Sequence, residues 1–337
     1  MLGFKYVSIY PKIMAWRSSI LKEEEIREAI ELDLKSLIDF IKGKLKKVSI
    51  TNEDIISVER AIRQEEFLFL KSVENFLYGN SKKFFKSWLK AYEIENIKLI
   101  LKSIILEKKD FLELLFNLGG TSKFQVEFVR EINTIDEFLD FLSGTEYYKI
   151  ARDTFPRVKE SKATFFFDVA LDNYFAFTLK RFYDSLFLKE KKSIKELLFY
   201  FIEAKRIVSL YRARFYFNFS KNECMVLVPE ILGILSQSRY EKLLDVPTEE
   251  EFLKLLSEWR LISIDVNTEI LENSIEYYFL KELLKRAKRG MKSGFFNLSL
   301  TLSFFILHYL NIKNWIALLE AKKEGISVED TLKFLVF

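Results

Sequence analysis

Helix breakers are scarce along the whole of this chain. Ten glycines and four prolines are spread over 337 residues, so long stretches contain nothing that would end a regular element. Leucine, lysine and glutamate are abundant, and all three favour helices. Strict alternation of polar and apolar residues is rare, and no Asn-Gly or Asp-Gly hairpin turn occurs. The sequence therefore predicts an all-α protein, in which the 34 phenylalanines pack between helices.

Helical spacing and helix-start signals support this prediction. Between Ile26 and Ile41, apolar residues recur at steps of three and four, the spacing of one helical face. A threonine followed three residues later by a glutamate forms a capping box. This pattern predicts helices that begin just after Thr134 and just after Thr248.

Two sequence landmarks recur three times in the same order. The first is the start of a short amphipathic helix, and the second is a helix that opens on an acid. The first landmark lies at residues 36–43, 137–144 and 251–256, and the second begins at Glu59, Asp168 and Glu272. Self-similarity at a fixed spacing indicates repeated structural units.

The third landmark is a helix with polar side chains at positions i, i+3 and i+9. Its leading positions are 110 apart (203 − 93) and then 108 apart (311 − 203). The third copy lacks the leading acid and has Glu320 at i+9. We predict structural roles for the residues at these positions: Glu93, Asn96 and Lys102, then Glu203, Arg206 and Arg212, then Asn311 and Asn314.

The repeat predicts three helical units of common domain size. We place them at residues 1–130, 131–240 and 241–337. Turn and pre-proline signals beside helix caps mark the two boundaries. They are Asn133-Thr134 and Pro247-Thr248.

The repeated helix, written acid-x-x-Asn-Ile-x-x-Ile/Leu-x-Lys/Arg, resembles the C-subunit family (also called the d-subunit family) of V-type and archaeal-type rotary ATPases. Residues 92–102 match this pattern well, and the tail 315–337 is also similar, with Lys322-Lys-Glu-Gly325-Ile followed by Val328-Glu-Asp. The second copy departs from the pattern because Arg206 stands where Asn is usual. The first helix of the family is matched only loosely by residues 10–17.

This resemblance implies a fold and a role. The fold would be a funnel-shaped body of three similar helical domains with pseudo-threefold symmetry. The role would be that of a non-catalytic part of the central stalk, which couples the central shaft to the membrane rotor ring of proteolipid subunits. It would transmit torque for proton or sodium transport in ATP synthesis or hydrolysis. Such a protein needs no cofactor and lies peripherally at the cytoplasmic face of the membrane.

The residues themselves offer little for catalysis. No phosphate-binding loop of the Gly-x-x-x-x-Gly-Lys-Ser/Thr type occurs, and Gly119-Gly120-Thr-Ser-Lys123 only superficially resembles one. One cysteine, Cys224, and one histidine, His308, are too few for a zinc cluster of either ligand type. We expect both to be buried core residues, and we predict no catalytic, cofactor or metal residues.

Charge and hydropathy each mark one further segment. Six cations opposed by Glu282 alone form a basic face, which is either solvated surface or a contact for acidic partner loops or anionic lipid heads. Nucleic acid is the poorer interpretation because 53 basic residues face 49 acidic ones. The uncharged run 293–312 predicts a buried core helix, since its polar residues would face lipid unsatisfied. The basic face comprises Lys281, Lys285, Arg286, Lys288, Arg289 and Lys292.

Two other functional classes stay open at this stage. One is a generic helical scaffold that binds proteins through an open array of helix pairs. The other is a helical enzyme with a site around His308 or a buried carboxylate, which would need an apolar pocket with converging polar groups.

Overall fold

The computed structural model describes residues 6–119, 122–229, 234–263, 274–293 and 297–337. Within these ranges the regular elements are helices, which confirms the all-α prediction. The chain divides into two compact units. One unit comprises residues 35–182, and the other joins residues 1–34 to residues 183–337.

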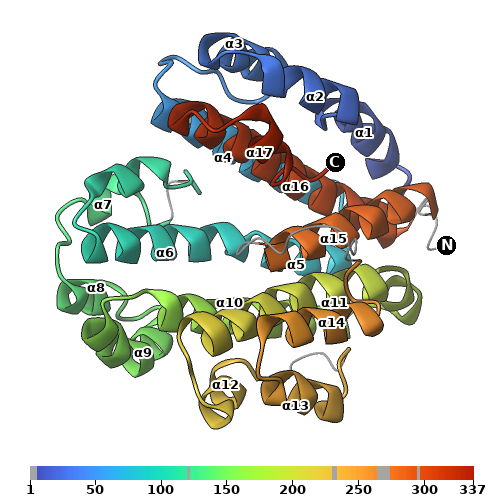
Figure 1. Cartoon of the computed structure of the whole chain (residues 1–337). Coiled ribbons are helices and arrows are strands. Elements are labelled where there is room, and N and C mark those ends of the chain that lie inside the picture. The colour runs from blue at the N-terminus through green and yellow to red at the C-terminus, as the bar shows by residue number, and fades with distance from the viewer. Residues whose placement is uncertain (1–5, 120–121, 230–233, 264–273, 294–296) are drawn as a thin grey trace. The chain divides into compact units, whose positions relative to one another are not determined.

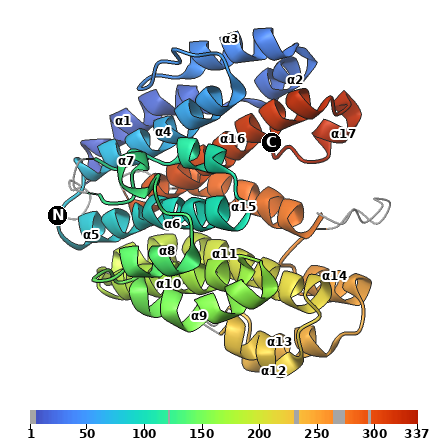
Figure 2. The ribbon, with the colours of Figure 1, turned by 90° about the vertical axis from the view of Figure 1, so that its left-hand side faces the viewer.

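The unit 35–182 is built around three long helices (Figure 2). Aromatic side chains fill its interior, as where Trp88 meets Phe175 with ring centroids 6.1 Å apart and Tyr92 meets Phe116 at 4.8 Å. Many of the described phenylalanines therefore pack between helices, whereas Phe128, Phe177, Phe187, Phe217 and Phe334 are exposed. Its elements are α3 (Leu34–Lys44), α4 (Ile55–Glu74), α5 (Gly79–Trp88), α6 (Lys90–Ile105), η3 (Lys109–Leu114), α7 (Val126–Val129), α8 (Ile135–Phe141), α9 (Tyr148–Ser161) and α10 (Phe165–Asp184).

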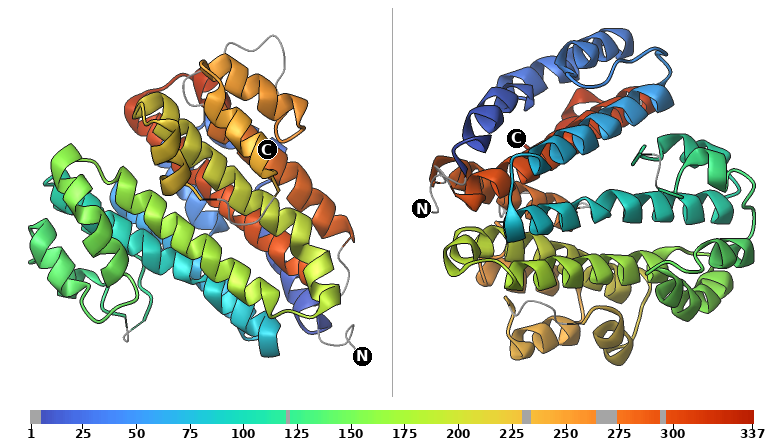
Figure 3. Two further views of the ribbon diagram at one scale, coloured as in Figure 1. Left: turned by 90° about the horizontal axis from the view of Figure 1, so that it is seen from below. Right: turned by 180° about the vertical axis from the view of Figure 1, so that it is seen from behind.

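In the second unit, α11, α15 and α16 contact one another (Figures 1 and 3). The first and last helices of the chain meet here, because α1 and α17 both pack on α16 and α17 also contacts α2. The elements of this unit are α1 (Ile9–Trp16), η2 (Arg17–Ser19), α2 (Glu23–Glu31), α11 (Leu188–Tyr211), η4 (Arg212–Tyr216), α12 (Lys221–Leu227), α13 (Gln237–Asp245), α14 (Glu249–Glu258), α15 (Ser274–Ser293), α16 (Leu298–Glu324) and α17 (Val328–Leu332).

Helix α16 is the core of the second unit. It is the one helix in the described ranges that is long and apolar enough to cross a membrane, yet 78% of its apolar window is buried inside the protein. The prediction of a buried core helix is thus confirmed for residues 298–312, while residues 294–296 of the predicted run lie outside the described residues. Helix α15 approaches it closely at Gly290, where an added Cβ would lie 2.1 Å from the Ser303 Oγ. A larger residue at position 290 would require the Ser303 hydroxyl to rotate away, since the Ser303 Cβ would still lie 3.3 Å from the added atom.

Both predicted helix starts are present. The Thr134 hydroxyl accepts a hydrogen bond from the Glu137 amide at 3.2 Å, and the Glu137 carboxylate accepts the Thr134 amide at 3.1 Å. The Thr248 hydroxyl likewise accepts from the Glu251 amide at 3.2 Å. Helices α8 and α14 begin at the next residue in each case.

The helices that carry the second landmark in the first and second copies have the same length. Helices α4 and α10 each have 20 residues, and their first residues are 110 apart (165 − 55). In the third copy, α15 is described from Ser274 to Ser293. Glu272, the predicted leading acid of the third copy, lies outside the described residues. The division at residues 130 and 240 stays a prediction, since the two compact units follow other boundaries.

Each of the three repeated helices is followed by a residue with left-handed backbone. Glu107, Asn218 and Gly325 have φ of 54°, 51° and 66°. Counted from the leading position of the landmark, their offsets are 14, 15 and 14 (107 − 93, 218 − 203, 325 − 311). The longer offset in the second copy coincides with η4, a π-helical turn. A π-turn inserts one residue into a helix, so it explains the difference.

Candidate structural and interaction sites

The i+3 position of the repeated helix binds the chain segment that follows 20 to 28 residues later. On α6, the Asn96 amide group donates to the Phe116 carbonyl at 2.9 Å and to the Phe124 carbonyl at 3.0 Å. The Asn96 Oδ1 accepts from the Phe116 amide at 2.8 Å. Asn96 is fully buried, so these bonds satisfy backbone groups that water cannot reach.

The third copy repeats this arrangement on α16. The Asn314 amide group donates to the Val336 carbonyl at 2.7 Å, and its Oδ1 accepts from the Val336 amide at 2.9 Å. Asn314 is buried, as Asn96 is. In both copies an asparagine on the helix therefore mimics a backbone partner for a returning extended segment.

In the second copy, a charged residue binds the segment that follows the helix. On α11, the Arg206 Nε donates to the Pro229 carbonyl at 2.9 Å, and its Nη1 pairs with the Glu203 Oε1 at 2.8 Å. Both side chains are almost completely buried, at 4% and 2% exposed. A buried arginine needs a counter-ion, and the leading acid of this copy supplies it.

The leading position otherwise contacts the beginning of the next copy. The Tyr147 hydroxyl donates to Glu93 at 3.1 Å. Burial raises the pKa of the Glu93 carboxyl, although Lys90 and the Tyr147 hydrogen bond act in the opposite direction. In the third copy, the Asn311 Oδ1 accepts from the Leu21 amide at 2.9 Å. That bond joins residues 290 positions apart.

The cation near i+9 has a different partner in each copy. The Lys102 ammonium lies 4.4 Å from the centre of the Phe111 ring. The Arg212 Nη2 pairs with Glu276 on α15 at 3.0 Å. In the third copy, where position i+9 is Glu320, the Lys322 ammonium donates to the Ile30 carbonyl at 2.6 Å. The cation of the second copy thus contacts α15, and that of the third copy contacts α2.

Two junctions between helices differ in their balance of acids and cations. Between α6 and α10, Lys98 pairs with Asp172 at 2.7 Å. Burial would lower the pKa of Lys98, but Asp172, Glu95 and Asp168 outweigh it and hold this pKa above its ordinary value. Burial raises the pKa of Asp168 to about 6, although Lys98 and the Thr164 hydroxyl favour its charged form. Sequence reasoning did not identify this cluster.

The junction between α11, α15 and α16 has the reverse composition. Glu276 pairs with Arg212 at 3.0 Å and with Lys313 at 2.9 Å. Burial would raise the pKa of Glu276, but Lys313, Arg212 and Lys205 outweigh it and lower this pKa. One acid among three cations therefore stays ionised.

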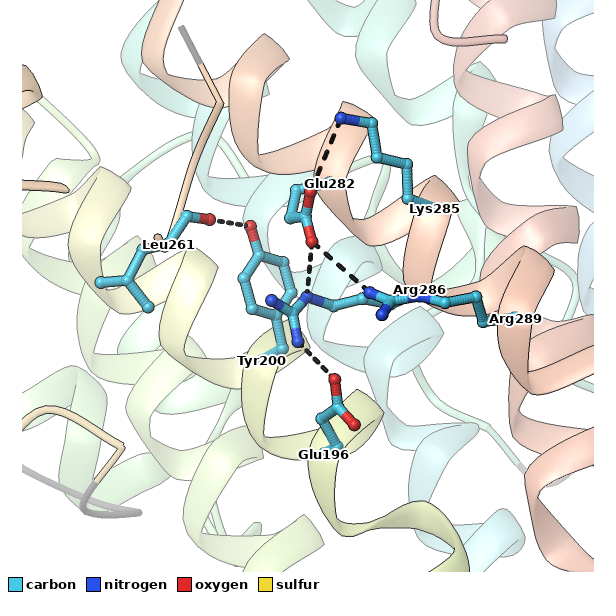
Figure 4. Close-up of polar contacts among 7 residues, drawn as sticks. All are labelled: Glu196, Tyr200, Leu261, Glu282, Lys285, Arg286 and Arg289. Carbon is cyan, nitrogen blue, oxygen red and sulfur yellow. Dashed lines mark hydrogen bonds and ion pairs between the residues drawn. The ribbon is translucent and has the colours of Figure 1, made fainter. Parts of the chain in front are cut away.

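The predicted basic face on α15 separates into paired and unpaired cations, and Figure 4 shows the paired ones. Arg286 is mostly covered, with its guanidinium 4.3 Å from the centre of the Tyr200 ring, and it pairs with Glu196 at 2.6 Å and with Glu282 at 3.1 Å. Lys285 and Arg289 also reach Glu282, at 3.8 and 3.7 Å. The sequence did not indicate that Glu196 and Tyr200, both on α11, contact the Arg286 guanidinium.

The remaining cations of this face are different. Lys288 and Lys292 are exposed, and among the described residues neither has an ion-pair partner. Lys281 is half-buried, with its ammonium 5.5 Å from the centre of the Tyr277 ring. Of the six cations predicted to form the basic face, only Lys288 and Lys292 are therefore both exposed and without an ion-pair partner among the described residues.

Comparison with known proteins identifies the family. The pattern of the ATP synthase (C/AC39) subunit family matches residues 9–334, which is nearly the whole chain. The chain belongs to this family.

Two relatives of this C/AC39 chain are C subunits of A-type ATP synthases. That of Methanocaldococcus jannaschii is 23% identical over 188 residues, which cover 52% of this chain and 46% of the relative. That of Methanosphaera stadtmanae is 27% identical over 175 residues, which cover 50% of this chain and 45% of the relative. The matched region thus spans slightly less than half the length of each relative.

Reactive side chains in this C/AC39 protein lie in the core. His308 is 1% exposed, and burial lowers its pKa to about 4. Cys224 is fully buried, and burial raises the pKa of its thiol. Both positions agree with the expected core role. The described part of the chain holds no group of three or more His, Cys, Asp or Glu side chains arranged to hold a metal.

Proposed function

We propose that this C/AC39 protein is the non-catalytic part of a rotary ATP synthase or ATPase that couples the central shaft to the membrane rotor ring. It turns with the rotor and passes torque between the ATP-driven and the ion-driven motors. It acts peripherally at the cytoplasmic face of the membrane, and its partners are the proteolipids of the ring and the proteins of the shaft. Family membership over residues 9–334 is the observation that carries this proposal.

The order of contacts between copies supports a role in carrying torque. Lys98 on α6 bonds to Asp172 on α10, within the second copy. Arg212 bonds to Glu276 in the third copy, and Asn311 bonds to Leu21 in the first. Each repeated helix is thus fastened to the copy that follows, and the last to the first. Close-packed elements held in this way transmit strain because they deform little.

The same contacts disfavour an open helical scaffold. A solenoid has contacts only between neighbouring repeats. The bond between Asn311 and Leu21 joins the two ends of the sequence instead. A body with a closed order of contacts suits a part that must keep its shape under torque.

Removal and restoration of the protein test this function. Membranes depleted of it should still hydrolyse ATP through the catalytic head but should lose ATP-driven ion transport. Adding back the purified chain should restore transport. The chain alone should neither bind nor hydrolyse ATP. If transport persisted undiminished in fully depleted membranes, the coupling role would be wrong.

A further inference from the structure

An exposed apolar pair lies at the N-terminal end of α11. Phe187 is 58% exposed and Leu188 is 68% exposed. Two exposed lysines, Lys189 and Lys192, follow directly on the same helix. Within the described ranges neither lysine has a hydrogen-bond or ion-pair partner.

The unpaired lysines of α15 belong to the same end of the unit. Arg212, at the end of α11, pairs with Glu276 at the start of α15. Glu196, near the start of α11, pairs with Arg286 towards the end of α15. The two helices are therefore antiparallel, and Lys288 and Lys292 lie on the stretch of α15 nearest the start of α11. Figure 1 draws both helix ends on its right-hand side.

The kind of cation left free indicates the kind of partner. Arginines suit carboxylates because their planar fork makes two parallel hydrogen bonds, and here Arg286 and Arg289 are already engaged by acids of this unit. Lys189, Lys192, Lys288 and Lys292, which have no ion-pair partner among the described residues, are compact charges without that directional preference. Lysines around exposed large apolar side chains are typical of a surface that contacts the interface of an anionic membrane.

We propose that Phe187, Leu188, Lys189, Lys192, Lys288 and Lys292 form a lipid-binding patch that contacts an anionic phospholipid bilayer. The lysines are attracted to the headgroup charge, and the apolar pair enters the headgroup layer. This contact goes beyond the proposed coupling role, since it involves lipid and no other protein. The isolated full chain should therefore possess it.

Vesicle sedimentation of the purified full chain tests the lipid-binding patch. The chain should sediment with vesicles in which about one lipid in three is phosphatidylglycerol, and not with pure phosphatidylcholine vesicles. The double variants K189E/K192E and K288E/K292E should each lower the affinity at least about 20-fold, at roughly fivefold or more per lysine. Leu188→Ser should lower it about tenfold, because the apolar contact is lost.

A matched pair of lysines provides the control. Lys83 and Lys86 on α5 are also exposed, so K83E/K86E makes the same charge change elsewhere. That variant should bind anionic vesicles within about twofold of the unaltered chain. Unfolding midpoints would verify that every variant is folded.

Three results would overturn the lipid-binding patch. The first is a failure of the unaltered chain to bind anionic vesicles. The second is an equal loss of binding in K83E/K86E, or no effect of Leu188→Ser, because binding would then be a diffuse charge effect. The third is a chain that does not bind vesicles but whose K288E/K292E variant fails to assemble with the other subunits in detergent. The patch would then bind an acidic protein. In each case the coupling role would stand, since its own test measures transport in depleted membranes.

Discussion

The first and second repeated helices hold the segments that follow them by different chemistry. On α6, Asn96 offers both a donor and an acceptor, so one neutral side chain satisfies the carbonyl and the amide of Phe116. On α11, Arg206 can only donate, and it needs Glu203 as a counter-ion. The comparison teaches that one position in a repeat can be filled by a neutral amide or by a charged pair. The charged pair is the more vulnerable to a single substitution.

The same two helices differ in the charge of their junctions. Lys98 on α6 lies among three acids, whereas Glu276 beside α11 lies among three cations. The pKa of Asp168 is raised, mainly by burial, whereas the pKa of Glu276 is lowered because Lys313, Arg212 and Lys205 outweigh its burial. Substitutions on α6 and α11, and at their junctions, should therefore change stability by different amounts and with different pH dependence.

Glu203→Ala should have the largest effect. It leaves the Arg206 guanidinium buried without its partner, a change that typically costs about 3–5 kcal/mol. Urea unfolding would measure the loss. The double variant E203Q/R206M should recover much of it, because it removes both buried charges together. A loss below about 1 kcal/mol in Glu203→Ala would show that the pair is not needed in the folded state.

Asn96→Ala should be the next most damaging change. It leaves buried carbonyl and amide groups of Phe116 unsatisfied, which costs about 1–3 kcal/mol. Asn314→Ala should behave similarly and should also speed amide exchange at Val336. The exposed Asn52 provides a matched control, and Asn52→Ala should change stability by less than about 0.5 kcal/mol. Equal losses of stability in Asn96→Ala and Asn52→Ala would show that the hydrogen bonds between Asn96 and Phe116 do not stabilise the first copy.

The two junctions should respond to pH with opposite signs. The pKa of Asp168 is about 6 against an ordinary value of 3.8, so its contribution to stability falls as pH rises from about 4 to about 6. Asp168→Asn should therefore raise stability at pH 7 by about 1–2 kcal/mol and change nothing at low pH.

The lowered pKa of Glu276 predicts stability that is present above its ordinary value of 4.5 and lost as pH falls below that value. Glu276→Gln should thus destabilise the chain at pH 7, by less than about 1 kcal/mol because the side chain is 37% exposed. Thermal unfolding between pH 4 and pH 7 would compare the variants. Shifts of the same sign in Asp168→Asn and Glu276→Gln would contradict the account.

Arg212→Ala should have the smallest effect. Its ion pair with Glu276 is exposed, with the arginine side chain 51% accessible. Exposed pairs contribute about 0–1 kcal/mol, and Lys313 still pairs with Glu276. Chemical denaturation should detect a loss of no more than about 0.5 kcal/mol. A loss as large as that of Glu203→Ala would mean that this junction, and not the buried pair, holds the second copy.

Sequence reasoning succeeded where local pattern decides the outcome. Helix content, the caps at Thr134 and Thr248, and the repeated helix follow from spacing and capping chemistry alone. It could not identify the partners of Asn96 and Arg206, because tertiary packing brings the returning segments back from 20 and 23 residues further along the chain. Nor could it separate Arg286 from the exposed basic face, since Tyr200 and Glu196 are brought from a helix some 90 residues earlier.

The closing contact between the ends of the sequence offers the most direct test of the coupling role. The double variant N311A/K322A removes the bonds to Leu21 and Ile30, and E320A/K323A alters exposed neighbours on the same helix. ATP hydrolysis and ATP-driven ion transport would be measured together on complexes rebuilt with each variant. We predict that N311A/K322A retains hydrolysis and loses most transport, while E320A/K323A retains both. Full transport with N311A/K322A would contradict the claim that this closed order of contacts carries the torque.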